Sequence, residues 1–149
     1  MIKKKLLLIS LVTILFIAIF HYFATAYYWY WTYKWIDIPV HIVGGFWVSI
    51  VALLVSLEIR HIDSINGYKR KSLLVMIISA LIIAFFWEIF ELVFKITSLH
   101  DVSYWRDSSI DIFNSLVGSV IAFLYFTKNK KSKNHLEDKI IKNDLVIAL

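Results

Sequence analysis

Four apolar runs, each close to the length of a membrane-spanning helix, constrain this chain more than any other feature. They cover residues 6–23, 38–57, 73–94 and 110–126 of the 149. A hydrocarbon core about 30 Å thick needs about 20 helical residues to cross it, and a helix satisfies its own backbone polar groups there. We therefore predict an all-α, polytopic membrane protein with a four-helix transmembrane bundle in residues 1–127.

The composition supports a lipid environment and excludes several other classes of protein. Hydrophobic residues make up 60% of the chain, above the roughly 45–50% that is typical of soluble domains. The sequence has no cysteine, which excludes disulfides and thiolate metal sites. The net charge of +5 comes from lysines beside the apolar runs. We therefore expect no nucleic-acid partner.

The positions of Lys and Arg beside the runs predict the orientation of the chain. Cytoplasmic loops retain an excess of positive charge. Most Lys and Arg residues lie near the two ends and in residues 58–72, whereas the opposite side carries only Lys34, Lys95 and Arg106. With four spans, both termini then lie in the cytoplasm. We expect a multi-pass protein of the plasma or inner membrane.

The beginning of the chain has two interpretations. Lys3–Lys5, the first apolar run and Ala24-Thr25-Ala26 resemble a cleavable secretory signal. However, the run is longer than a signal core of roughly 7–15 residues, and the aromatic stretch Tyr27–Trp31 follows it directly. A retained first helix is the interpretation that we favour, with cleavage as the alternative.

Residues 128–149 form a basic cytoplasmic tail. Lys128–Lys133 is suited to the anionic headgroups of membrane lipids. Beyond it, Leu136, Ile140 and Leu145 recur at helical spacing. The tail therefore folds either as a short surface helix or not at all.

Ionisable side chains in three of the runs gather near the outer end of the predicted bundle. Charged groups within a membrane are costly, and they usually face the bundle interior at a functional site. The pairs are Asp37 and His41, Glu88 and Glu91, and Asp107 and Asp111. Asn114 lies on the same helical face as Asp107 and Asp111. The small residues Gly44, Gly45 and Gly118 let helices approach closely. We predict an outward-facing polar pocket made by the second, third and fourth helices.

Some of these residues also have local structural explanations. Asp37 precedes Ile38-Pro39, so it can satisfy free N–H groups at a helix start. Ser108 and Asp111 fit a capping box of the form S-x-x-D. Neither cap explains Asn114, which lies further along the same helical face, or the two glutamates on another run. Glu88 and Glu91 are one turn apart in an apolar run, so their carboxylates need a partner or a proton.

The gathered acids favour a bound cation. Like charges this close cannot all ionise unless a cation compensates them, and Arg106 is positioned to neutralise one acid. One imidazole with several carboxylates suits zinc, manganese or iron. A divalent metal ion is therefore the candidate cofactor, although no strict motif such as HExxH is present. Its candidate ligands are His41, Glu88, Glu91 and Asp111, supported by Asp37, Arg106, Asp107 and Asn114.

The chain also resembles the YjdF-like family of small integral membrane proteins. The resemblance rests on Asp37-Ile-Pro-Val-His41-Ile-Val-Gly44, Trp87-Glu88-Ile-Phe-Glu91 and Asp107-Ser-Ser-Ile-Asp111 with Gly118. The chain resembles VanZ-like proteins more loosely, because they tend to have Gln where this chain has Glu91. The resemblance covers residues 37–120 and implies that the polar set is shared. It implies no activity.

Several functions fit this pocket. We expect it to bind a cation, a metal or a lipid-linked envelope component. If the protein is a hydrolase or transferase acting on a lipid headgroup, Glu88 or Glu91 would be the general base, and His41 or a metal would stabilise developing charge. A proton- or cation-coupled transporter is another alternative. In the last alternative, the protein is an accessory subunit of a larger complex or a homo-oligomer.

Overall fold

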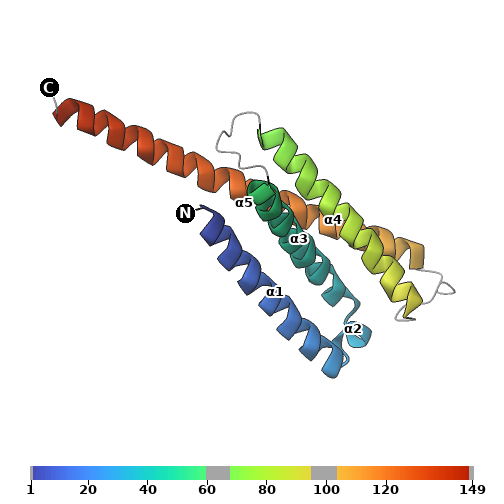
Figure 1. The fold of residues 1–149 in the computed structure, drawn as a ribbon. Helices are drawn as coiled ribbons and strands as arrows, with labels where there is room; N and C mark the ends of the chain where they lie inside the picture. Colours follow the sequence, from blue (N-terminus) through green and yellow to red (C-terminus); the bar gives the residue numbers. More distant parts are fainter. Residues whose placement is uncertain (1, 60–67, 95–103, 148–149) are drawn as a thin grey trace.

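The fold, seen in a computed structural model that describes residues 2–59, 68–94 and 104–147, consists of helices and short turns within these ranges. The elements in chain order are α1 (Ile2–Ala26), α2 (Trp29–Thr32), the 3₁₀ helix η1 (Lys34–Ile36), α3 (Asp37–Ile59), α4 (Tyr68–Val93) and α5 (Tyr104–Ile147) (Figure 1). Four of them have 18-residue or longer stretches apolar enough to cross a membrane. The predicted all-α class with four long apolar helices is confirmed.

The last helix differs most from its expected bounds. It begins at Tyr104, six residues before the expected span, and continues to Ile147 without a break. In Figure 1 its C-terminal half projects beyond the other helices. The chain contains neither Gly nor Pro after Gly118, so nothing in the sequence interrupts the backbone hydrogen bonding. Residues 128–147, for which the sequence left open a short surface helix or no regular fold, are therefore a continuation of α5; residues 148–149 lie outside the described part of the chain.

A short aromatic connection joins α1 to α3. The chain turns at Tyr28, whose φ of 58° is left-handed, and then forms α2 and η1 before α3 begins. Asp37 already has helical angles, φ −67° and ψ −37°, whereas an N-cap residue is normally extended. Pro39 lies in the first turn, where its missing N–H costs nothing. Asp37 is thus the first residue of α3 rather than its cap.

Helix α3 lies at the centre of the packing, because it contacts α1, α4 and α5. Its closest neighbour is α5, and two glycines make this approach possible. A Cβ on Gly45 would lie 2.6 Å from the Ser115 carbonyl carbon, and one on Gly118 would lie 2.7 Å from the Phe46 nitrogen. Only glycine fits at such a crossing. Gly44, which we expected to share this role, has open space around it among the described residues.

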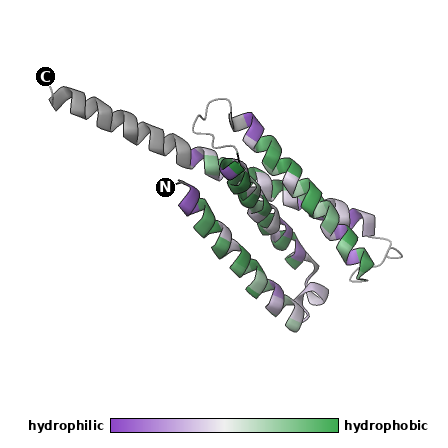
Figure 2. Ribbon diagram, in the orientation of Figure 1, coloured by the Kyte–Doolittle hydropathy of each residue, from purple (hydrophilic) through white to green (hydrophobic). Residues whose placement is uncertain are grey.

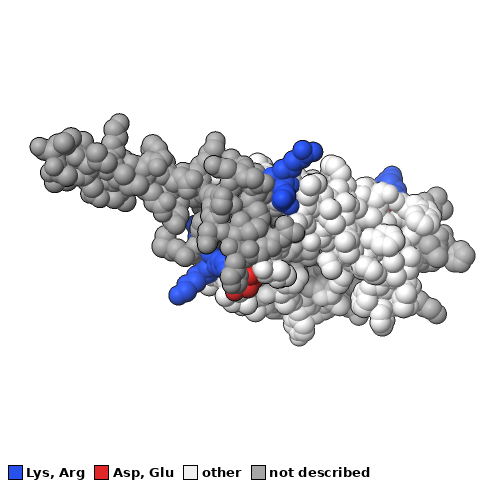
Figure 3. Space-filling view, turned by 45° about the horizontal axis from the view of Figure 1, so that its top comes forward, with Lys and Arg blue, Asp and Glu red and all other residues white. Residues whose placement is uncertain are grey.

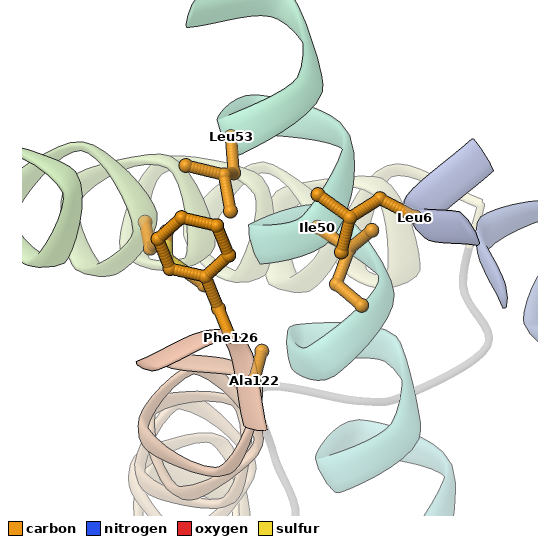
Figure 4. Packing of buried hydrophobic residues seen from close by; sticks show 6 residues of the cluster. Leu6, Ile50, Leu53, Ala122 and Phe126 are labelled. Carbon is orange, nitrogen blue, oxygen red and sulfur yellow. The ribbon is translucent and has the colours of Figure 1, made fainter. Parts of the chain in front are cut away.

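The apolar core lies at the end of the bundle remote from α2. It joins α1, α3, α4 and α5 through Leu6, Ile50, Leu53, Met76, Ala122 and Phe126. Figure 4 shows Phe126 and Ala122 of α5 pointing toward Ile50 and Leu53 of α3, with Leu6 of α1 at the margin. This cluster ties the four long helices together and leaves the polar residues to the opposite end.

The surface of the bundle is largely apolar. Large hydrophobic side chains such as Leu15, Phe85 and Phe113 are more than half exposed, and green residues run along the spanning helices in Figure 2. In Figure 3 the charged side chains lie toward the ends, with uncharged surface between them. An apolar surface of this extent needs lipid around it.

Candidate functional site

The closest group of ionisable side chains joins α3 to α5. The Nε2 atom of His41 lies 3.4 Å from Oδ1 of Asp37 and 3.8 Å from Oδ1 of Asp111. One ligand atom from each residue lies within 4.8 Å of those from the other two. Asp37 and His41 are one turn apart on α3, so they share a face. The glycine crossing one turn further along brings Asp111 of α5 to that face.

Burial differs across this group. The side chain of His41 is 8% exposed and that of Asp111 is 12% exposed, whereas that of Asp37 is 41% exposed. The group is therefore closed on the α5 side and open beside Asp37.

Helix α4 adds two carboxylates beside this group. Glu88 is buried, and it interacts electrostatically with His41 and Asp111. Glu91 is partly buried and accepts a hydrogen bond of 2.8 Å from Nε1 of Trp87, one turn earlier on α4. The charge of Glu91 is therefore partly offset by a donor on its own helix.

Of the remaining candidate site residues, some lie in the interior of the bundle and others lie at its margin. Arg106 and Asp107 are exposed in the first turn of α5, so they lie at the margin. Asn114 is buried one turn beyond Asp111, and its Nδ2 atom has no hydrogen-bond partner among the described residues. Buried amide groups are normally paired, so Asn114 has capacity for a further polar partner.

The structure does not support the capping box at Ser108 and Asp111. Because α5 begins at Tyr104, Ser108 already lies in the second turn and is buried. The neighbouring Ser109 hydroxyl donates to the carbonyl of Trp105, 2.7 Å away. Asp111 therefore lies inside the helix, where free N–H groups at a helix start do not account for it.

A residue pair that the sequence did not indicate lies next to this group. The Nδ1 atom of His21 on α1 lies 3.0 Å from the hydroxyl of Tyr30 on α2. Burial raises the pKa of Tyr30 to about 12, with contributions from the carboxylates of Asp37 and Glu91. Tyr30 is thus a neutral hydroxyl near the acids. Its place within the aromatic stretch Tyr27–Trp31 gave no signal that distinguished it from its neighbours.

The two distances at His41 are compatible with a metal ion. Zinc binds His nitrogen and carboxylate oxygen atoms at a distance of about 2.0–2.2 Å. In a tetrahedral site, two ligand atoms of the same ion are therefore about 3.3–3.6 Å apart. The separations of 3.4 and 3.8 Å around His41 are close to that edge length. The grouped residues are Asp37, His41 and Asp111, so Asp37, expected only as support, takes a central place. Glu88 and Glu91 lie beside them.

The comparisons with known proteins identify a family but no activity. A family model described as "Predicted membrane protein (DUF2238)" matches residues 3–132. This range includes all four long helices up to the start of the basic tail. No curated protein and no solved structure matches the chain.

Proposed function

Because the chain belongs to the DUF2238 family of predicted membrane proteins, and is thus a multi-pass membrane protein, we propose that it binds a divalent metal ion within its helix bundle. The ion is held by His41 together with Asp37 and Asp111. The observation that carries this proposal is the convergence of these three ligand atoms within 4.8 Å at a largely buried point.

The chemistry of the ligands supports a metal over an ion pair alone. One imidazole and two carboxylates are the donors that zinc, manganese and iron accept. If the group held no ion, buried Glu88 would add a further negative charge beside Asp111, and such charges are costly within a membrane. A divalent cation offsets that cost. Glu88 and the unpaired amide of Asn114 then orient the ligands or a bound water.

The proposal places this site at the outer side of the membrane. The Lys and Arg distribution supports cytoplasmic termini. Asp37 begins α3 and Asp111 lies near the start of α5, both at the opposite end of the bundle. The YjdF-like resemblance that we retain rests on the same residues, Asp37, His41 and Asp111. An envelope component approaching from the outer leaflet would meet the ion through the open side beside Asp37.

Elemental analysis of the purified full chain tests the proposal. After incubation with zinc, manganese or iron(II) and desalting, we expect a stoichiometric amount of one of these metals. His41→Ala and Asp111→Asn should each lower the metal affinity by about tenfold or more, because each removes one ligand, and one good ligand contributes at least ~1.4 kcal/mol.

Two matched variants serve as controls. His21→Ala removes a histidine that contacts Tyr30 instead, and Asp107→Asn removes an exposed aspartate on the same helix as Asp111. Both should retain wild-type metal content. A wild-type protein without metal, or equal loss in site and control variants, would refute the proposal. Circular dichroism and size-exclusion chromatography of Asp111→Asn, which is isosteric, separate ligand loss from misfolding.

A further inference from the structure

An apolar groove separates α1 from α3 near the end that α2 connects. Its volume is about 260 Å³. The lining residues are Phe16, Ile17 and Phe20 of α1, Trp29 of α2, Trp35 and Ile36 of η1, and Pro39, Val40 and Val43 of α3. No charged, hydroxyl or amide side chain occurs among these residues, and a buried water needs several polar partners. The groove therefore favours an apolar occupant.

The groove lies along the middle of α1, between the residues that are fully buried near its two ends. Among the described residues of α1, only Leu6, Ser10 and Ala24 are buried, while the intervening turns carry the lining residues Phe16 and Phe20. Since both helices span the membrane, the solvent that reaches this groove is hydrocarbon.

The mouth of the groove lies at the level of lipid headgroups. Trp29 and Trp35 line it, and aromatic rings of this kind mark the membrane–water interface. Tyr30 and Asp37 follow directly after the lining residues Trp29 and Ile36 in the sequence. A molecule with its chain in the groove would therefore have its polar end beside the hydroxyl of Tyr30 and the partly exposed carboxylate of Asp37.

The charge at this end of the bundle selects among headgroups. The acids here are Asp37, Glu88, Glu91, Asp107 and Asp111. With Asp101, which precedes α5, they make six acids against the three cations Lys34, Lys95 and Arg106 on the same side. The excess of three negative charges is larger than the two charges of a divalent ion. The mouth therefore remains negative with or without a metal. This charge attracts an ammonium headgroup and repels an anionic one.

We propose that the groove between α1 and α3 holds one acyl chain of a phosphatidylethanolamine molecule, with its ammonium group at the carboxylates beside the mouth. The lipid is then a specific ligand of the protein rather than bulk bilayer. This goes beyond metal binding and does not depend on it, because the groove and the excess of acids remain without the ion.

Native mass spectrometry of the full chain tests this proposal. The protein is reconstituted in equimolar phosphatidylethanolamine and phosphatidylglycerol with identical acyl chains, and is then extracted into mild detergent. We expect one retained phospholipid per chain. Phosphatidylethanolamine should exceed phosphatidylglycerol by about fivefold, the equivalent of ~1 kcal/mol for a partly exposed ion pair. Glu91→Gln should reduce this preference while the lipid is still retained.

Variants that fill the groove provide the decisive comparison. Val43→Trp places an indole in the groove and should abolish retention. Val55→Trp makes the same change at an exposed position on α3 and should not. Ile17→Trp fills the groove from the opposite wall, so it covers the case in which Val43→Trp does not fold.

Three results would each overturn the proposal. These are no retained lipid in the wild type, retention of phosphatidylglycerol or a non-glycerolipid in preference, or equal retention by Val43→Trp and Val55→Trp. Metal content is measured in the same samples. Val43→Trp should keep the wild-type value, so a failure of the groove and a failure of the metal site are distinguishable.

Discussion

At the scale of single residues, two glycines determine whether the charged groups meet. Gly45 and Gly118 lie where the backbones of α3 and α5 cross, and an added Cβ at either would overlap backbone atoms of the partner helix. Gly45 lies one helical turn from His41, and Gly118 lies about two turns from Asp111. A displacement of α5 at Gly118 would therefore separate the imidazole of His41 from the carboxylate of Asp111.

Gly118→Ala should consequently destabilise the bundle and weaken the metal site together. The added methyl group meets the backbone of Ile42 and Phe46, which cannot rotate away. Overpacking of this kind costs about 1–3 kcal/mol. Gly44→Ala is the matched control, because a methyl group there meets open space among the described residues. Unfolding in detergent measures the first effect and metal titration the second, and equal behaviour of the two variants would contradict this explanation.

At the scale of elements, α4 packs through a narrow stripe of residues four apart. Ser72, Met76, Ala80, Ala84 and Glu88 are its buried residues, and the bulky side chains between them face outward. The small residues in the middle let α4 lie close to both α3 and α5, which it contacts. This close packing holds the buried carboxylate of Glu88 beside His41.

Ala80→Leu should push α4 away from α3 and α5. Ala80 is 1% exposed, so the larger side chain has no room, and the expected loss is about 1–3 kcal/mol of unfolding free energy. Ala18→Leu introduces the same side chain at an exposed position of α1. It should leave the unfolding free energy unchanged within about 0.5 kcal/mol. If both variants unfold alike, the close packing of α4 is not what stabilises the bundle.

At the scale of the whole molecule, the two ends of the bundle have different chemistry. The end remote from α2 has the apolar core and the exposed ion pair between Lys3 and Glu58. The other end has the aromatic connection, the acids and the lipid groove. Helices of alternating direction bring the start of α3, the end of α4 and the start of α5 to this second end.

Reporter fusions test which end faces the cytoplasm. The distribution of Lys and Arg predicts that a chain truncated and fused at Lys69 places its reporter inside, and that one fused at Tyr104 places it outside. An alkaline phosphatase fusion is active only outside, and a fluorescent protein fusion is fluorescent only inside. Alkaline phosphatase activity at Lys69 together with fluorescence at Tyr104 would invert the proposed orientation and move the metal site to the cytoplasmic side.

The sequence by itself determined the number and the approximate places of the long helices. Hydropathy is a local property, and a run of about 20 apolar residues has one stable conformation in a bilayer. The alternation of spans also placed the acids of α3, α4 and α5 at one end. The start of α5 at Tyr104 was not predicted. The polar residues before Ile110 lower the hydropathy of this segment, although they are helical.

Only the tertiary structure decided which of the acids meet. Spacing shows that Asp37 and His41 share a face, but the rotation of one helix against another depends on the contacts that Gly45 and Gly118 permit. Those contacts made Asp111 the partner of His41 and left Glu88 and Glu91 beside the group. The groove likewise depends on the spacing between α1 and α3. Such distances depend on how side chains of several helices pack together, and no single segment of the sequence contains that information.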